Sequence, residues 1–210
     1  LATAAVALAL DAKVLASGYT PRSGPRRFGF GLEESLQPFA AADFVRAIPG
    51  APHVFNDHAF GTFLAWYWDG KPQIYFHGYV LDAQFYLEDY VAISRTAADF
   101  DRIVKEHDIG VFFLRRVPAS PTSGPLVYKL LLTRPDWHLV FWDNRALVFV
   151  KDTPALQPLV AANEYKWLDP FRPERVSAGA KAAPAELLDE AVRQLHRAPD
   201  SDWVRGIVRS

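Results

Sequence analysis

The stretch that decides the fold spans residues 52–90 and reads PHVFNDHAFGTFLAWYWDGKPQIYFHGYVLDAQFYLEDY. Two short apolar runs in it, residues 53–55 and 73–76, have the composition of buried strands. An aromatic segment, residues 60–68, lies between them with helical spacing, and the preceding Asn56-Asp57 pair is of the type favoured at helix N-caps. This stretch therefore predicts a strand, a capped helix and a second strand.

Further elements follow outward from this stretch. We expect helices over residues 33–48, 81–90, 96–107 and 126–133, and strands over residues 109–114, 137–142 and 146–151. Strands that alternate with helices predict a parallel sheet, and the turn Asp143-Asn144-Arg145 predicts an antiparallel hairpin. The expected fold is α/β, with a mixed, largely parallel central sheet of about five strands, flanking helices, a C-terminal hairpin and a C-terminal helical appendage.

Composition divides the chain into four parts. Residues 1–31 combine an apolar start, LATAAVALAL, with a basic Pro/Gly linker, and residues 32–151 form the α/β core. Residues 152–183 form a Pro- and Ala-rich strap, which is expected to wrap the core in extended form. Residues 184–210 form the helical appendage. The apolar start is shorter than the ~20 residues of a membrane span, so it is either the end of a truncated transmembrane helix or an ordinary N-terminal helix. The appendage is a helix, a Pro break and a second helix, a pattern compatible with the start of a helical-repeat region.

Composition also excludes several function classes. The chain has 210 residues, no Cys and a net charge of −1, so it has neither a disulfide framework nor a thiolate metal site. No stripe of Lys and Arg with interleaved aromatic residues is present, which argues against a nucleic-acid partner. No phosphate-binding glycine loop or other cofactor signature occurs, and no cofactor is expected.

Polar side chains follow each predicted strand. In parallel α/β sheets, ligands bind beyond the carboxyl ends of the strands. The candidate ligand-facing rim therefore consists of Asn56, Asp57, His58, His77, Tyr79 and Arg115.

Two kinds of chemistry and one purely structural role are compatible with this rim. Asp57, His58, His77 and Asp82 are potential nitrogen and oxygen ligands of a metal, but no HExxH or similar spacing supports a metal site. Asp57 and His58 are a potential acid/base pair, but the chain has no GxSxG motif and no Cys nucleophile. The plain alternative is that Asn56 or Asp57 caps a helix and the histidines are rim residues without a catalytic role. No catalytic or metal-binding residue is assigned.

The segment FNDHAFGTFLAWYWDGKPQIYFHG resembles a segment of large bacterial membrane proteins of the GT-C glycosyltransferase superfamily. These are relatives of dolichyl-phosphate-mannose protein mannosyltransferases and of lipid-A aminoarabinose transferase. The likeness covers residues 28–151 and is carried by Asn56, Asp57, Gly61, Leu64, Trp66, Gly78, Asp89 and Tyr90. The chain departs from the family pattern at His58, Phe60, Thr62, His77 and Tyr79.

The resemblance implies a domain on the periplasmic side of the bacterial inner membrane. In such proteins the catalytic acids lie on an early loop of the membrane part, which this chain does not contain. The implied role is that of a non-catalytic accessory domain that shapes recognition of a glycan or lipid-linked sugar acceptor, or of a partner. The rival hypotheses are a stand-alone soluble enzyme that uses Asp57, His58 and His77, and a protein-interaction module that works through the C-terminal helices.

Overall fold

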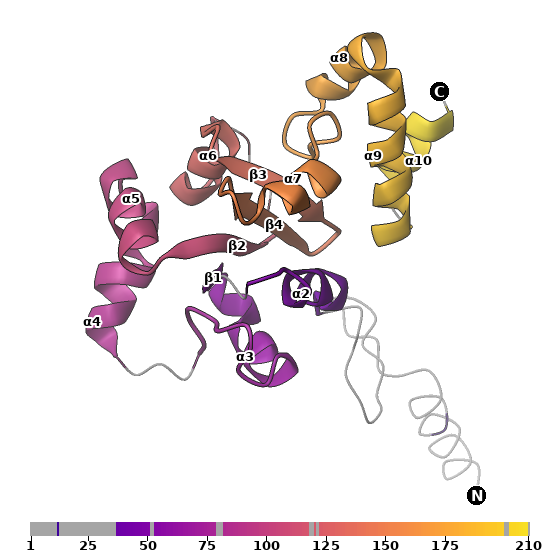
Figure 1. The fold of residues 1–210 in the computed structure, drawn as a ribbon. Coiled ribbons are helices and arrows are strands. Elements are labelled where there is room, and N and C mark those ends of the chain that lie inside the picture. The colour runs from indigo at the N-terminus through magenta and orange to yellow at the C-terminus, as the bar shows by residue number, and fades with distance from the viewer. Residues whose placement is uncertain are drawn as a thin grey trace, which may run out of the picture. The chain divides into compact units, whose positions relative to one another are not determined.

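The structure is a computed structural model that describes residue 12 and residues 37–50, 53–78, 82–117, 120, 122–199 and 202–209. The chain divides into two units, Leu1–Gln37 and Pro38–Ser210, and the fold described below belongs to the second. The apolar start and the basic linker predicted within residues 1–31 lie outside the described residues, apart from the helical residue 12. The second unit has helices on both faces of a central sheet, which confirms the predicted α/β class (Figure 1).

Within the described residues, the central sheet has four strands in the order β1-β2-β4-β3. They are β1 (His53–Asn56), β2 (Ile109–Arg115), β3 (Trp137–Trp142) and β4 (Ala146–Lys151). Strand β1 pairs parallel with β2, whereas β4 pairs antiparallel with both β2 and β3. Strands β1, β2 and β3 therefore run in one direction, but β4 lies between β2 and β3. The hairpin is confirmed, while the expectation of a largely parallel sheet is correct only for the β1–β2 pair.

The expected strand at residues 73–76 does not form, which is why the sheet has four strands rather than about five. The segment runs beside β1 and makes one isolated parallel bridge, between Val54 and Ile74. The side chain of Asn56 binds the backbone N–H groups of Tyr75 and Phe76, which a neighbouring strand would otherwise bind. A side chain thus replaces the backbone ladder at this edge.

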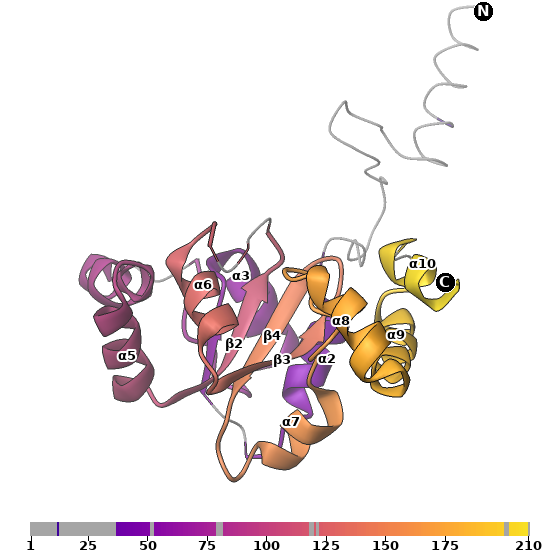
Figure 2. The ribbon, with the colours of Figure 1, turned by 90° about the horizontal axis from the view of Figure 1, so that it is seen from above.

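The helices cover the two faces of the sheet (Figure 2). Strand β2 shows the division, because Phe112 and Leu114 point to one apolar cluster and Val111 and Phe113 to the other. The first face is covered by α5 (Ala97–Glu106), α6 (Leu126–Thr133) and α9 (Pro184–Arg197). The second face is covered by α2 (Phe39–Arg46), α3 (His58–Tyr67) and α7 (Gln157–Asn163). The apolar run of β2 is buried on both faces, as its composition predicts.

Short helical segments complete the described fold. The predicted helix at 81–90 is divided into α4 (Ala83–Phe85) and a π-helical turn η2 (Tyr86–Tyr90), which a short 3₁₀ turn η3 (Ala92–Ser94) follows. The Pro- and Ala-rich part was expected to be extended, but it contains α7 and α8 (Glu174–Ala182). The final helix is α10 (Asp202–Arg209). Across the described ranges, no helix combines the length and apolar character that crossing a bilayer requires.

Helix α9 is held to the rest of the unit by buried polar contacts. Leu187 and Ala191 belong to the apolar cluster of the first sheet face. Between them, the buried carboxylate of Glu190 accepts hydrogen bonds from three successive backbone N–H groups, those of residues 166–168. Gln194 donates to the carbonyl of Trp142 at 2.8 Å. Residues 184–197 are therefore part of the packed core.

Candidate functional site

Asn56, the last residue of β1, is buried and all of its hydrogen-bonding capacity is used inside the protein. Its Oδ1 accepts from the backbone N–H groups of Tyr75 and Phe76 at 2.9 and 3.1 Å. Its Nδ2 donates to the carbonyls of Phe76 and Asp57 at 2.7 and 3.1 Å. A carboxamide offers two donors and two acceptors, so no group is left for a ligand. Asn56 fastens residues 75–76 to the edge of the sheet.

Asp57 is the N-cap of α3, as predicted. Its Oδ1 accepts from the N–H of Ala59 at 2.9 Å, which satisfies one of the free donors of the first helical turn. Two basic side chains lie beside the same carboxylate: Nδ1 of His58 at 3.5 Å and Nε of Arg115 at 3.9 Å. Both are well exposed, His58 at 64% and Arg115 at 53%. The structure therefore brings together three of the predicted rim residues.

Two tyrosines complete this rim. The hydroxyl of Tyr90 accepts from the backbone N–H of His58 at 2.7 Å, and its ring stacks on Phe76 with centroids 4.4 Å apart. The hydroxyl of Tyr128 donates to the carbonyl of Arg115 at 2.6 Å. Burial raises the pKa of both phenols well above the usual value, so both are neutral donors and acceptors near neutral pH. Tyr90 was noted in the sequence only as part of the family resemblance and was not predicted to belong to the rim, whereas no sequence feature indicated Tyr128.

Gly61 sets how closely α3 approaches the segment that precedes His77. A Cβ atom at Gly61 would lie 2.3 Å from the carbonyl oxygen of Phe76 and 2.8 Å from Cα of His77. Only a residue without a side chain fits there, because real Cβ atoms do not approach backbone atoms so closely. The glycine serves a backbone contact within the protein, and His77 follows that contact as a half-buried residue.

Three further polar residues follow the predicted strands: Tyr79, which belongs to the predicted rim, and Asp82 and Arg116, which do not. Tyr79 lies outside the described residues. Arg116, the neighbour of Arg115 in the sequence, donates to the carbonyl of Asp143 at 3.0 Å, and its guanidinium lies 5.0 Å from the centre of the Trp142 ring. Asp82 caps α4 by accepting from the N–H of Phe85.

In the described part of the chain, Asp57, His58, His77 and Asp82 do not form a group with metal-ligand spacing. A different group in the described part, formed by Asp89, Glu106 and His107, has such spacing. The guanidinium of Arg102 lies within it, 3.4 Å from Asp89 and 2.7 Å from Glu106. One guanidinium thus pairs with both carboxylates. The contacts are those of a partly exposed ion-pair network, and no metal site is assigned to it.

Comparisons with known proteins identify no relative of this chain. No family model matches the chain, and no similar protein is found among curated proteins or solved structures. The rim offers an exposed imidazole and an exposed guanidinium beside a carboxylate that caps a helix. Such donors form charge-assisted hydrogen bonds with hydroxyl or acidic groups.

Proposed function

We propose that this chain is an extracytoplasmic, non-catalytic accessory domain of a GT-C-like membrane glycosyltransferase. It works on the periplasmic side of the bacterial inner membrane, where it shapes recognition of the acceptor or of a partner. The observation that carries the proposal is that three of the residues on which the family resemblance rests have structural roles inside the domain. Asn56 binds the backbone of residues 75–76, Asp57 caps α3, and Gly61 allows α3 to approach the backbone of residues 76–77.

The rim itself supports recognition rather than chemistry. His58 and Arg115 expose donors beside a carboxylate that already serves as a helix cap. A glycan or lipid-linked sugar acceptor carries hydroxyl and anionic groups that such donors bind. In the described part of the chain, the Asp57 carboxylate contacts the N–H of Ala59, the imidazole of His58 and the guanidinium of Arg115. These are hydrogen-bond donors rather than nucleophiles, which favours acceptor binding.

The proposal is tested in the full membrane protein by transfer kinetics. His58→Ala and Arg115→Ala should raise the KM for the acceptor while changing kcat little, because they remove binding groups and no catalytic group. Arg95→Ala, which removes an exposed arginine that is not a rim residue, is the matched control. Loss of kcat at unchanged KM in His58→Ala would contradict an accessory role. A gene without apolar spans upstream of the Leu1 codon would exclude the membrane assignment.

A second candidate is a stand-alone enzyme that uses Asp57, His58 and His77. The observation in its favour is the exposed imidazole of His58, 3.5 Å from the carboxylate of Asp57. The test is a screen of the 210-residue chain for bound metal and for hydrolase activity, in the wild type and in His58→Ala and His77→Ala. A wild-type chain with neither metal nor activity would exclude this candidate.

A third candidate is a protein-interaction module that works through the C-terminal helices. Three exposed apolar side chains favour it: Leu188 and Val192 on α9, and Val208 on α10. Deleting residues 184–210 would remove core side chains, so the surface variants Leu188→Ser and Val192→Ser are the better test. If both variants capture the same partners as the wild type, this surface is not the interface.

A further inference from the structure

A polar cavity of about 300 Å³ lies between the end of α6, the start of β3 and the turn that precedes α8. Its charged lining residues are Arg134, His138, Glu164, Arg172 and Arg175. Strand β3 runs in the same direction as β1 and β2, and the cavity lies at its amino end. The rim of Asp57 and Arg115 lies at the carboxyl ends, so the cavity is a separate site on the opposite edge of the sheet.

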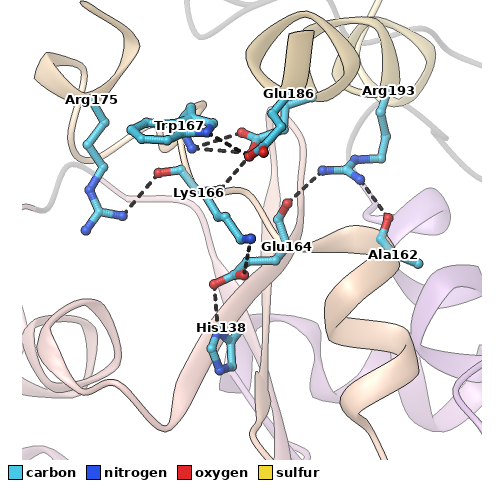
Figure 3. Close-up of polar contacts among 9 residues, drawn as sticks. His138, Ala162, Glu164, Lys166, Trp167, Arg175, Glu186 and Arg193 are labelled. Atoms are coloured by element: carbon cyan, nitrogen blue, oxygen red, sulfur yellow. Dashed lines mark hydrogen bonds and ion pairs between the residues drawn. The ribbon is translucent and has the colours of Figure 1, made fainter. Parts of the chain in front are cut away.

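The arginines of the cavity differ in how many donors they have left. Arg134 uses both terminal nitrogens on the carboxylate of Asp101. Arg172 uses only Nε, which donates to Asp169 at 2.7 Å. Arg175 uses only one terminal nitrogen, in a 3.3 Å hydrogen bond to the carbonyl of Lys166 (Figure 3). A guanidinium has five N–H donors, so Arg172 and Arg175 each keep several without an acceptor in the described part of the chain.

The only carboxylate that lines the cavity in the described residues is occupied. Nδ1 of His138 donates to Glu164 at 2.6 Å, and the ammonium of Lys166 lies 4.0 Å from its other oxygen (Figure 3). Glu164 is therefore committed to His138 and Lys166. Asp101 and Asp169 neutralise Arg134 and Arg172, whereas Arg175 adds a positive charge with no carboxylate partner among the described residues. The cavity thus has both excess donors and excess positive charge.

We propose that this cavity binds a phosphate-type oxyanion, held by the unused N–H groups of Arg172 and Arg175. A tetrahedral oxyanion presents several acceptor oxygens, and guanidinium forks bind such groups with paired, charge-assisted hydrogen bonds. The two arginines lie one turn apart, since the N–H of Arg175 donates to the carbonyl of Arg172 at 3.0 Å. The proposal is independent of the proposed function, because it involves neither His58 nor Arg115.

The test is a titration of the 210-residue chain with inorganic phosphate at constant ionic strength, followed by NMR. The reporters are the indole N–H of Trp137 and the backbone N–H of Arg175, both in residues that line the cavity. Arg175→Gln should weaken binding about tenfold or more, because it removes a charge-assisted donor pair. Arg95→Gln removes the same charge at an exposed position elsewhere and should leave binding unchanged.

A second variant keeps the test decisive should Arg175→Gln alter local structure. Glu164→Gln removes the negative charge from the lining and should tighten phosphate binding several-fold. Before titration, a cooperative thermal unfolding transition is used to check that both variants are folded. The proposal is overturned by the absence of saturable shifts at the two reporters, or by equal loss of binding in Arg95→Gln and Arg175→Gln. Weaker binding in Glu164→Gln also overturns it.

The source of the phosphate is assigned by a vesicle experiment. The chain is sedimented with phosphatidylcholine vesicles that contain or lack phosphatidic acid, which carries a phosphomonoester. Capture that needs phosphatidic acid and Arg175 identifies a lipid headgroup as the source. Saturable binding of free phosphate without vesicle capture identifies a soluble phosphomonoester. Failure in both experiments excludes the site.

Discussion

The two polar regions of the domain use their hydrogen-bonding groups in opposite ways. At the carboxyl end of β1, Asn56 and Asp57 use their groups on the backbone of their own chain. At the amino end of β3, Arg172 and Arg175 retain most of their donors around a cavity of about 300 Å³. The first region is dense in polar residue types that suggest a site, and yet its most buried members are structural.

Residue type alone therefore does not identify a binding group. What matters is the number of donors and acceptors left after the protein has satisfied its own backbone. By that measure, Asn56 has nothing to offer a ligand, His58 and Arg115 offer exposed groups, and Arg175 offers a charge beside a cavity. Four predictions test this distinction.

The largest effect is expected for Asn56→Asp. The substitution keeps the shape of the side chain but places a carboxylate oxygen against the carbonyls of Phe76 and Asp57. The oxygen that replaces Nδ2 would face two carbonyl acceptors while the other oxygen keeps its two N–H donors, and this repulsion in a buried site should cost about 3 kcal/mol of unfolding free energy, measured by urea denaturation. The same change at the exposed Asn144 is the control and should cost little. A small effect at Asn56 would show that its hydrogen bonds to residues 75–76 contribute little to stability, and it would contradict the structural role assigned to Asn56.

Gly61→Ala should have the next largest effect. The new methyl group would lie 2.3 Å from the carbonyl oxygen of Phe76, so the backbone of α3 or of residues 76–77 must move. We expect a loss of about 3 kcal/mol, as for overpacked core positions. At Gly78 the nearest atom is Oγ1 of Thr62 at 3.6 Å, and Gly78→Ala should change stability by about 0.5 kcal/mol or less. Equal melting temperatures for the two variants would contradict the close contact.

Tyr90→Phe should have a moderate effect with a distinct pH dependence. It removes the acceptor for the N–H of His58 and should cost about 1 kcal/mol near neutral pH. Because burial raises the pKa of Tyr90 in the folded protein, its contribution is fully present below the unfolded value of about 10 and is lost as the pH rises through the folded pKa. The difference between wild type and variant should therefore shrink above about pH 10 in urea denaturation. An identical alkaline slope in the two proteins would show that the Tyr90 phenol is not buried.

Asp101→Asn should have the smallest effect. Arg134 holds the pKa of Asp101 below its usual value, so the ion pair stabilises above about pH 4 and its contribution is lost as the pH falls through the folded pKa. The carboxylate is 58% exposed, and exposed pairs contribute less than about 1 kcal/mol. A double-mutant cycle with Arg134→Gln measures the coupling. A coupling well above 1 kcal/mol would show that the Arg134–Asp101 pair contributes to stability as strongly as the buried contacts of Asn56.

Local patterns predicted most of the elements. The runs at 109–114, 137–142 and 146–151 became β2, β3 and β4, because apolar composition and turn residues act over a few positions. Asp57 and Thr96 cap α3 and α5 as their residue types predict. The pairing order could not be predicted in the same way. It depends on β4 entering between β2 and β3, which is a contact between distant segments.

The α/β class and the capped helix after β1 could be predicted from the sequence alone, whereas a ligand-binding role for the rim stays a prediction. The class and the cap depend on periodicity and on the preference of short polar side chains for helix N-termini. Only the tertiary structure decided that Asn56 replaces a strand ladder and that Gly61 serves a backbone contact. It also decided that Arg172 and Arg175 share a cavity with His138. The physical reason is that hydrogen-bond satisfaction is a property of the assembled neighbourhood, which brings together residues far apart in the chain.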